Sequence, residues 1–192
     1  MTMRLPLLAL AGTLALAGCG LGPKVPPVLM RLTPDATLSA SARTSATSSA
    51  ITVVEPSVGE ELSTPRVPVR TGATQVAYLK DAQWVEEPGA LFARLLSETI
   101  AARTGRVVLD PKQFTFDPGQ RLSGTLHTFG IQADTMEAVA VYDAALARGP
   151  ESVETRRFEA RIPVAAITPA AAADALNRAA NQIAGEVAAW IG

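Results

Sequence analysis

The sequence predicts an α+β fold in which a mostly antiparallel sheet carries two helices packed on one face. Two segments place apolar residues at helical spacing, and short β-branched or alternating segments stand before and between them. Strands, a helix, more strands and a second helix follow one another within residues 51–192. That order is typical of helices segregated to one face of an antiparallel sheet.

The first strands are predicted from β-branched runs at 51–54, 66–70 and 75–79. Pro68 restricts the second run to a sheet edge or a strand end, because proline cannot donate a ladder hydrogen bond. Residues 71–74 contain Gly72 and predict a hairpin loop between the second and third strands.

The first helix is predicted to begin at Pro88 and to end at Thr104 and Gly105. Its apolar stripe consists of Leu91, Phe92, Leu95, Leu96 and Ile100. Further strands are predicted at 107–109, 121–128, 137–146 and 156–164. The third of these is rich in alanine and could be a helix, but its strict alternation favours a strand.

The last helix is predicted to start at the pair Thr168 and Pro169, which suit the N-cap and first helical positions. Its buried face is marked by Leu176, Ile183, Val187 and Ile191. The same helix is rich in alanine, and Trp190 could pack back on the domain or join a subunit contact. The sequence therefore leaves open whether the protein forms a homo-oligomer.

The N-terminus carries Arg4 followed by an apolar run from Leu5 to Ala17. The run is too short for a membrane span, which needs about 20 residues. It has the features of a signal peptide, and its end, Leu16-Ala17-Gly18-Cys19, resembles the bacterial lipobox, in which the cysteine is acylated. The alternative is an ordinary signal with a stray cysteine. Gly20 stands where an aspartate often marks inner-membrane retention, which favours the outer membrane while leaving the inner membrane possible.

Three segments are therefore expected: a lipoprotein signal peptide at 1–18, a lipidated N-terminus and flexible tether at 19–50, and an α+β domain at 51–192. Residues 20–27 are rich in Gly and Pro, and residues 33–50 are rich in Ser and Thr. Between them, residues 28–32 form a short apolar run that could be an edge strand.

Charge and motifs exclude several classes of function. The net charge is −1 and no Lys/Arg run is present, which argues against nucleic acid as a partner. A single histidine, His127, and a single cysteine cannot supply a typical zinc site. Ser123 lies in no nucleophile elbow, and the adjacent Glu86 and Glu87 suit a solvated helix entrance rather than a paired acid and base. We expect no enzymatic activity, no metal and no cofactor other than the lipid on Cys19.

A family resemblance rests on residues 51–105. Its features, in order, are Ile51 and Val53 with Pro56, Leu62 before Arg66 and Val67, Tyr78 with Leu79, and Trp84 with Glu87 and Pro88 leading into an amphipathic helix. Behind a lipobox, this order resembles the PqiC-like, ABC-type transport auxiliary lipoproteins that accompany MCE lipid transport systems. The chain departs from the family at Gln83, where arginine is common, and at Gly89, where an apolar residue is common.

The resemblance implies a non-enzymatic accessory on the periplasmic face of a membrane. Its partners would be an MCE-family periplasmic protein and, indirectly, an inner-membrane ABC transporter that moves lipid or another apolar substrate. This chain has no P-loop, so ATP hydrolysis would belong to a partner. Two alternatives stay open: an activator that docks on a cell-wall synthase, and a lipid-carrying lipoprotein.

Three residues are candidates for binding the partner protein: Trp84, Tyr78 and Leu79. Tryptophan is enriched among interface hot spots, so Trp84 could lie on an exposed docking patch. The competing interpretation places its ring in the core. Tyr78 and Leu79 are expected in the core or at its margin.

Overall fold

The structure is a computed structural model that describes residues 28–37, 50–112, 120–149 and 152–192. The predicted signal peptide at 1–18 and the predicted lipidation site, Cys19, lie outside the described residues.

Three long strands form one side of the sheet: β8 (Gln120–Gln132), β9 (Glu137–Arg148) and β10 (Val153–Pro163). Both pairs are antiparallel, with a bulge in β8 between Leu126 and Thr128. In β9, Ala138, Ala140, Tyr142, Ala144 and Leu146 are buried on one face. The alternation that favoured a strand over a helix for this segment is therefore confirmed.

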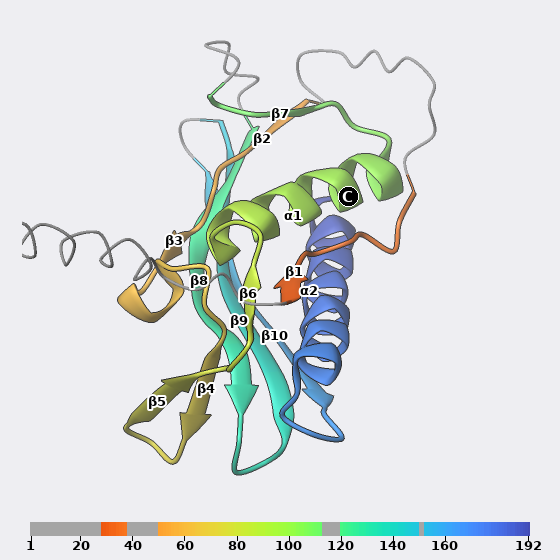
Figure 1. Cartoon of the computed structure of the whole chain (residues 1–192). Helices are drawn as coiled ribbons and strands as arrows, with labels where there is room; N and C mark the ends of the chain where they lie inside the picture. Colours follow the sequence, from red (N-terminus) through yellow and green to blue (C-terminus); the bar gives the residue numbers. More distant parts are fainter. Residues whose placement is uncertain (1–27, 38–49, 113–119, 150–151) are drawn as a thin grey trace, which may run out of the picture.

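Short strands join the other side of β8 (Figure 1). They are β2 (Ile51–Val53), β3 (Ser57–Val58), β4 (Pro68–Thr71), β5 (Gln75–Tyr78) and β7 (Val108–Leu109). The strands β2, β3 and β4 run parallel to β8, whereas β4 and β5 form an antiparallel hairpin around Gly72. Pro68 is the first residue of its strand, as predicted, so the sheet loses no ladder hydrogen bond within β4.

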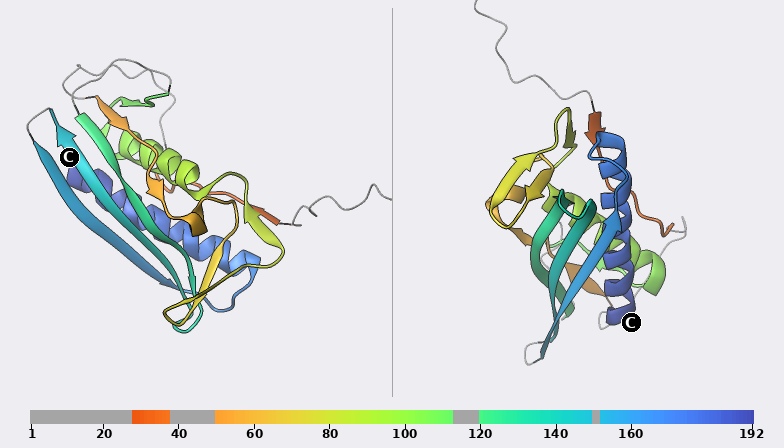
Figure 2. Two further views of the ribbon diagram at one scale, coloured as in Figure 1. Left: turned by 90° about the vertical axis from the view of Figure 1, so that its left-hand side faces the viewer. Right: turned by 90° about the horizontal axis from the view of Figure 1, so that it is seen from below.

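Both helices lie on the same face of the sheet (Figure 2). The first, α1 (Pro88–Thr104), ends at Gly105, whose left-handed φ of 72° suits glycine at this position. The second, α2 (Pro169–Ile191), follows Thr168 as predicted. All the apolar residues predicted for the two buried faces are buried. The predicted α+β fold with two helices on one face is confirmed.

The core between the helices and the sheet is built around aromatic rings. Trp84 stacks on Phe129 with ring centroids 5.3 Å apart, and Phe92 packs edge-on against Tyr142 at 5.2 Å. The Tyr142 hydroxyl donates to the carbonyl oxygen of Ser123 at 3.0 Å, and burial raises the pKa of Tyr142. Trp190 packs against Phe158 at 5.7 Å, so its ring folds back on the domain.

The segment 28–35 belongs to the folded domain. Its strand β1 (Val28–Met30) pairs in parallel with β6 (Ala82–Trp84), and Met30 is buried in the core. Beyond β1, the Thr33 amide donates to Asn177 and the Asp35 amide donates to Asn181, each at 2.8 Å. The tether predicted for 19–50 therefore does not extend over these residues, because strand pairing and side chains of α2 fix them. Residues 38–49 lie outside the described residues.

Candidate functional site

An open hollow of about 370 Å³ lies between the β4–β5 hairpin and the start of α2. The lining comes from three stretches of chain that meet at one end of the sheet: Val69; Ala77 to Asp81; and Ile167 to Pro169. Two of the predicted partner-binding residues, Tyr78 and Leu79, therefore lie side by side in its wall.

The local backbone explains why these side chains remain partly exposed. Tyr78 ends β5, and the Leu79 amide then donates to the carbonyl oxygen of Val67 at 2.9 Å. Asp81, with a left-handed φ of 58°, turns the chain into β6. The hairpin strand β5 pairs only with β4, so the residues after it reach the rim of the sheet instead of its interior.

The hollow is apolar in its wall, and its rim carries charges of both signs, because exposed Asp81 lines it next to Lys80. Tyr78 and Leu79 are half-buried, while Ile167 is 36% exposed. The Arg66 guanidinium lies over the Tyr78 ring, 4.0 Å from its centroid, and Lys80 is exposed beside it. Tyrosine and arginine are each enriched among the residues that contribute most to protein interfaces.

Trp84 does not share this surface. Its side chain is 1% exposed and it stacks on Phe129 in the core. The hypothesis that Trp84 lies on an exposed docking patch is therefore wrong, because β6 turns this residue inward while it pairs with β1. Sequence reasoning also missed Ile167, which enters the hollow only through the fold.

A polar cluster lies on the face of the sheet that the helices do not cover. Asp143 accepts two hydrogen bonds from Arg157, each at 2.6 Å, and its carboxylate lies 2.8 Å from Nε2 of His127. Arg157 and then His127 lower the pKa of Asp143 to about 2. His127 is therefore a strand histidine with a hydrogen-bonding partner.

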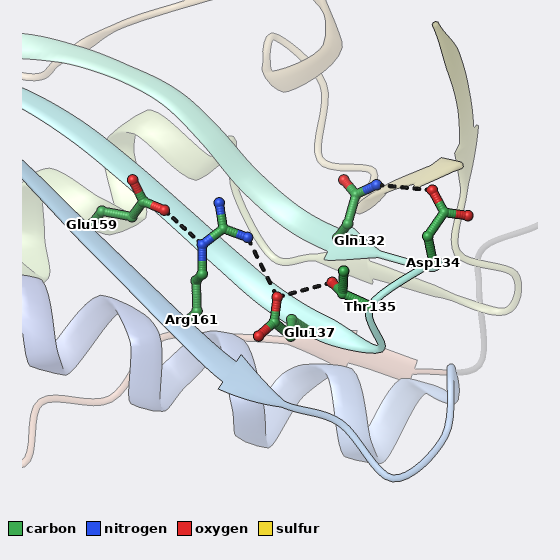
Figure 3. Close-up of polar contacts among 6 residues, drawn as sticks. All are labelled: Gln132, Asp134, Thr135, Glu137, Glu159 and Arg161. Carbon is green, nitrogen blue, oxygen red and sulfur yellow. Dashed lines mark hydrogen bonds and ion pairs between the residues drawn. The ribbon is translucent and has the colours of Figure 1, made fainter. Parts of the chain in front are cut away.

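The same face continues as a chain of ion pairs toward the turn between β8 and β9 (Figure 3). Arg161 bonds Glu159 at 2.6 Å and Glu137 at 3.3 Å, and the hydroxyl of Thr135 also donates to Glu137. These groups are solvent-exposed and mutually paired, so each pair contributes little to stability and none presents an activated acid or base.

A charged cleft of about 300 Å³ opens beside the N-terminal half of α1. Glu86 pairs there with Arg94 at 2.7 Å, and Glu55 pairs with Lys112 at 2.8 Å. The hydrogen bond that Arg94 donates to Glu86 raises the pKa of Arg94. The predicted role of Glu86 as part of a solvated helix entrance agrees with this geometry.

Among the residues that the structure describes, no group of three or more His, Cys, Asp or Glu side chains could hold a metal ion. Within the same ranges, neither helix is long and apolar enough to cross a membrane.

A comparison with protein families matches residues 31–188 to the ABC-type transport auxiliary lipoprotein component. The chain belongs to this family. The match begins at Arg31, within the segment that the structure packs onto the domain, and it ends in the last turn of α2. Membership makes the chain a membrane-anchored lipoprotein that assists ABC-type transport.

Two solved structures show the same fold. A crystal structure of a protein from Xanthomonas campestris gives a TM-score of 0.71 at 18% identity, covering 85% of this lipoprotein and 93% of that chain. The crystal structure of an uncharacterized protein gives a TM-score of 0.66 at 16% identity. The match covers 79% of this chain and 97% of that chain. The PelC dodecamer from Paraburkholderia phytofirmans gives a TM-score of only 0.39 at 13% identity. That match covers 77% of this chain and 92% of that chain. A comparison with curated proteins gave no match.

Proposed function

We propose that this lipoprotein is held by lipid on Cys19 at the periplasmic face of the outer membrane and serves an MCE-type transport system for lipid or another apolar substrate. It acts by binding a periplasmic MCE-family protein, and through that protein it acts with an inner-membrane ABC transporter. It is not an enzyme and uses no cofactor beyond the covalent lipid. Family membership and the Leu16-Ala17-Gly18-Cys19 sequence support this proposal.

The observation that carries the binding role is the hollow with Tyr78 and Leu79 in its wall. It offers partly exposed apolar and aromatic side chains at the margin of the core. The core itself is packed with side chains from the sheet and the two helices. The net charge of −1 provides little long-range steering, so short-range apolar contact is the available source of affinity.

The test is chemical crosslinking of the full-length protein in native membranes, followed by its purification and identification of the captured proteins. We expect an MCE-family protein. Truncating an interface hot spot costs about 2 kcal/mol or more, so Tyr78→Ala and Ile167→Ala should lower capture by roughly thirtyfold. Val76→Ala is the matched control, because Val76 is exposed on the same hairpin but does not line the hollow.

Thermal unfolding of each variant separates loss of binding from loss of folding. Capture of cell-wall synthases without any MCE-family protein would replace the proposal with the activator alternative. A stoichiometric phospholipid in the purified protein would favour the lipid-carrying alternative.

A further inference from the structure

The hollow lies next to Val28, the first residue that the structure describes after the predicted lipidation site Cys19. The Val28 amide donates to the carbonyl oxygen of Asp81 at 3.3 Å, and Asp81 lines the hollow. Directly after it, Val28 pairs with Ala82 in the β1–β6 ladder. Val28, the described residue nearest to Cys19 in the sequence, therefore lies at the rim of the hollow.

The chain between Cys19 and this rim is short. Val28 follows Cys19 by nine residues, and a fully extended chain spans at most about 3.3–3.6 Å per residue. Val28 can thus lie no farther than about 30 Å from the lipidated residue.

The sheet is longer than this connection. The twelve residues of β9 span about 40 Å at 3.4 Å per residue. The hollow is at the end where β8 turns into β9, because Ile167 follows the end of β10, where Pro163 pairs with Glu137. Turning the opposite end, with the β9–β10 connection, toward the bilayer would carry Val28 beyond the reach of nine residues.

We infer that the hollow faces the membrane that holds Cys19 and binds its protein partner there, within about 30 Å of the bilayer. This inference rests on the proposed function. The occupant is a membrane-proximal protein segment that places an apolar side chain against Tyr78, Leu79 and Ile167. Polar groups beside that side chain would meet both the cations Arg66 and Lys80 and the carboxylate of Asp81.

The test changes only the distance between the domain and the membrane. A photo-crosslinking residue is placed at Ala77, which is exposed and lines the hollow. Twenty Gly/Ser residues are then inserted between Gly22 and Pro23 of the full-length protein. This extends the eight residues between Cys19 and Val28 to twenty-eight. Because effective concentration falls as about the −3/2 power of linker length, crosslinking to the partner in native membranes should fall roughly sixfold.

The matched control is the same insertion between Ser41 and Ala42. The connection there starts after Asp35 and ends at Ala50, which are both fixed to the domain, so its length does not change the distance to Cys19. The control should crosslink as the unmodified protein does. In detergent, where no bilayer sets the distance, the tether-extended protein should co-purify with the partner to the full extent.

A second measurement tests the orientation without any partner. Energy transfer to a lipid dye should be stronger from a fluorophore at Val76 than from one at Val153, which is 63% exposed at the start of β10. Equal transfer from the two positions would overturn the inference even if partner capture succeeds. Full crosslinking by the tether-extended protein, or crosslinking of position 77 to Lys24 of its own chain, would also overturn it. Absence of any partner in detergent together with strong transfer from position 76 would instead contradict the proposed function.

Discussion

At the scale of single residues, Trp84 separates a structural role from a binding role. The ring stacks on Phe129 in the core, and its Nε1 has no hydrogen-bond acceptor among the described residues. Trp84→Ala should cost about 3–5 kcal/mol in the free energy of unfolding, because a large cavity remains. Trp84→Phe keeps a stacked ring and removes the unpaired N–H, so it should cost much less.

Denaturant unfolding of the two variants checks this expectation. Partner capture should follow the folded fraction in both. If the Trp84→Ala protein kept its stability but no longer captured the partner, Trp84 would have a binding role rather than a structural one.

Asp143 makes the stability of the fold depend on pH in the acid range. Arg157 and His127 hold the pKa of Asp143 at about 2, below its ordinary value of 3.8. A depressed carboxyl pKa means that the unfolded chain takes up the proton first as pH falls. The stabilisation is therefore complete above about pH 4 and is lost between pH 4 and 2.

Asp143→Asn should remove this part of the acid dependence. Unfolding curves at pH 6, 4, 3 and 2 measure it, and added salt should weaken the effect because the group is solvent-exposed. A variant whose stability falls as steeply as the unmodified protein between pH 4 and 2 would show that Asp143 is not the group responsible.

At the scale of elements, two asparagines one turn apart on α2 hold the segment after β1. Asn181 accepts from the Asp35 amide and donates to the carbonyl oxygen of Thr33, while Asn177 accepts from the Thr33 amide. Asn181→Ala leaves backbone groups without partners and should cost about 1–3 kcal/mol. Amide hydrogen exchange at Thr33 and Asp35 should speed up, whereas exchange in β9 should change little.

Arg178→Ala is the matched control on the same helix, because Arg178 makes an exposed pair with Asp174 and no other ion pair within the described ranges. Such i,i+4 pairs contribute about 0.3–0.5 kcal/mol. If both variants exchange at the same rates, the asparagines do not hold the segment.

The limits of sequence-based prediction also lie at this scale. Both helices were predictable because Pro88, Gly105 and the pair Thr168 and Pro169 mark their ends by local chemistry. The β6 strand was not predicted, and only an edge strand was considered at 28–32, because β1 and β6 stabilise each other across some fifty residues of sequence. No local pattern encodes such a pairing. The hollow was partly anticipated through Tyr78 and Leu79, but Ile167 joins them only in three dimensions.

At the scale of the whole molecule, the lipid anchor is the testable feature. Cys19→Ala should abolish incorporation of labelled palmitate and leave uncut precursor or a released soluble form, because the acylated thiol is lost. Radiolabelling and membrane fractionation measure both effects. Incorporation of palmitate by the Cys19→Ala protein would rule out Cys19 as the lipidated residue.

The attachment of β1 also decides how the molecule responds to force. A pull on the chain ahead of Val28 first meets the hydrogen bonds between β1 and β6, and then those that Asn177 and Asn181 make with residues 33–35. The long hairpins β8–β9 and β9–β10 and the helix pair lie outside this path. Tension between membrane and partner would therefore be borne by a small set of hydrogen bonds and by the burial of Met30, which can yield and re-form while the long hairpins stay paired.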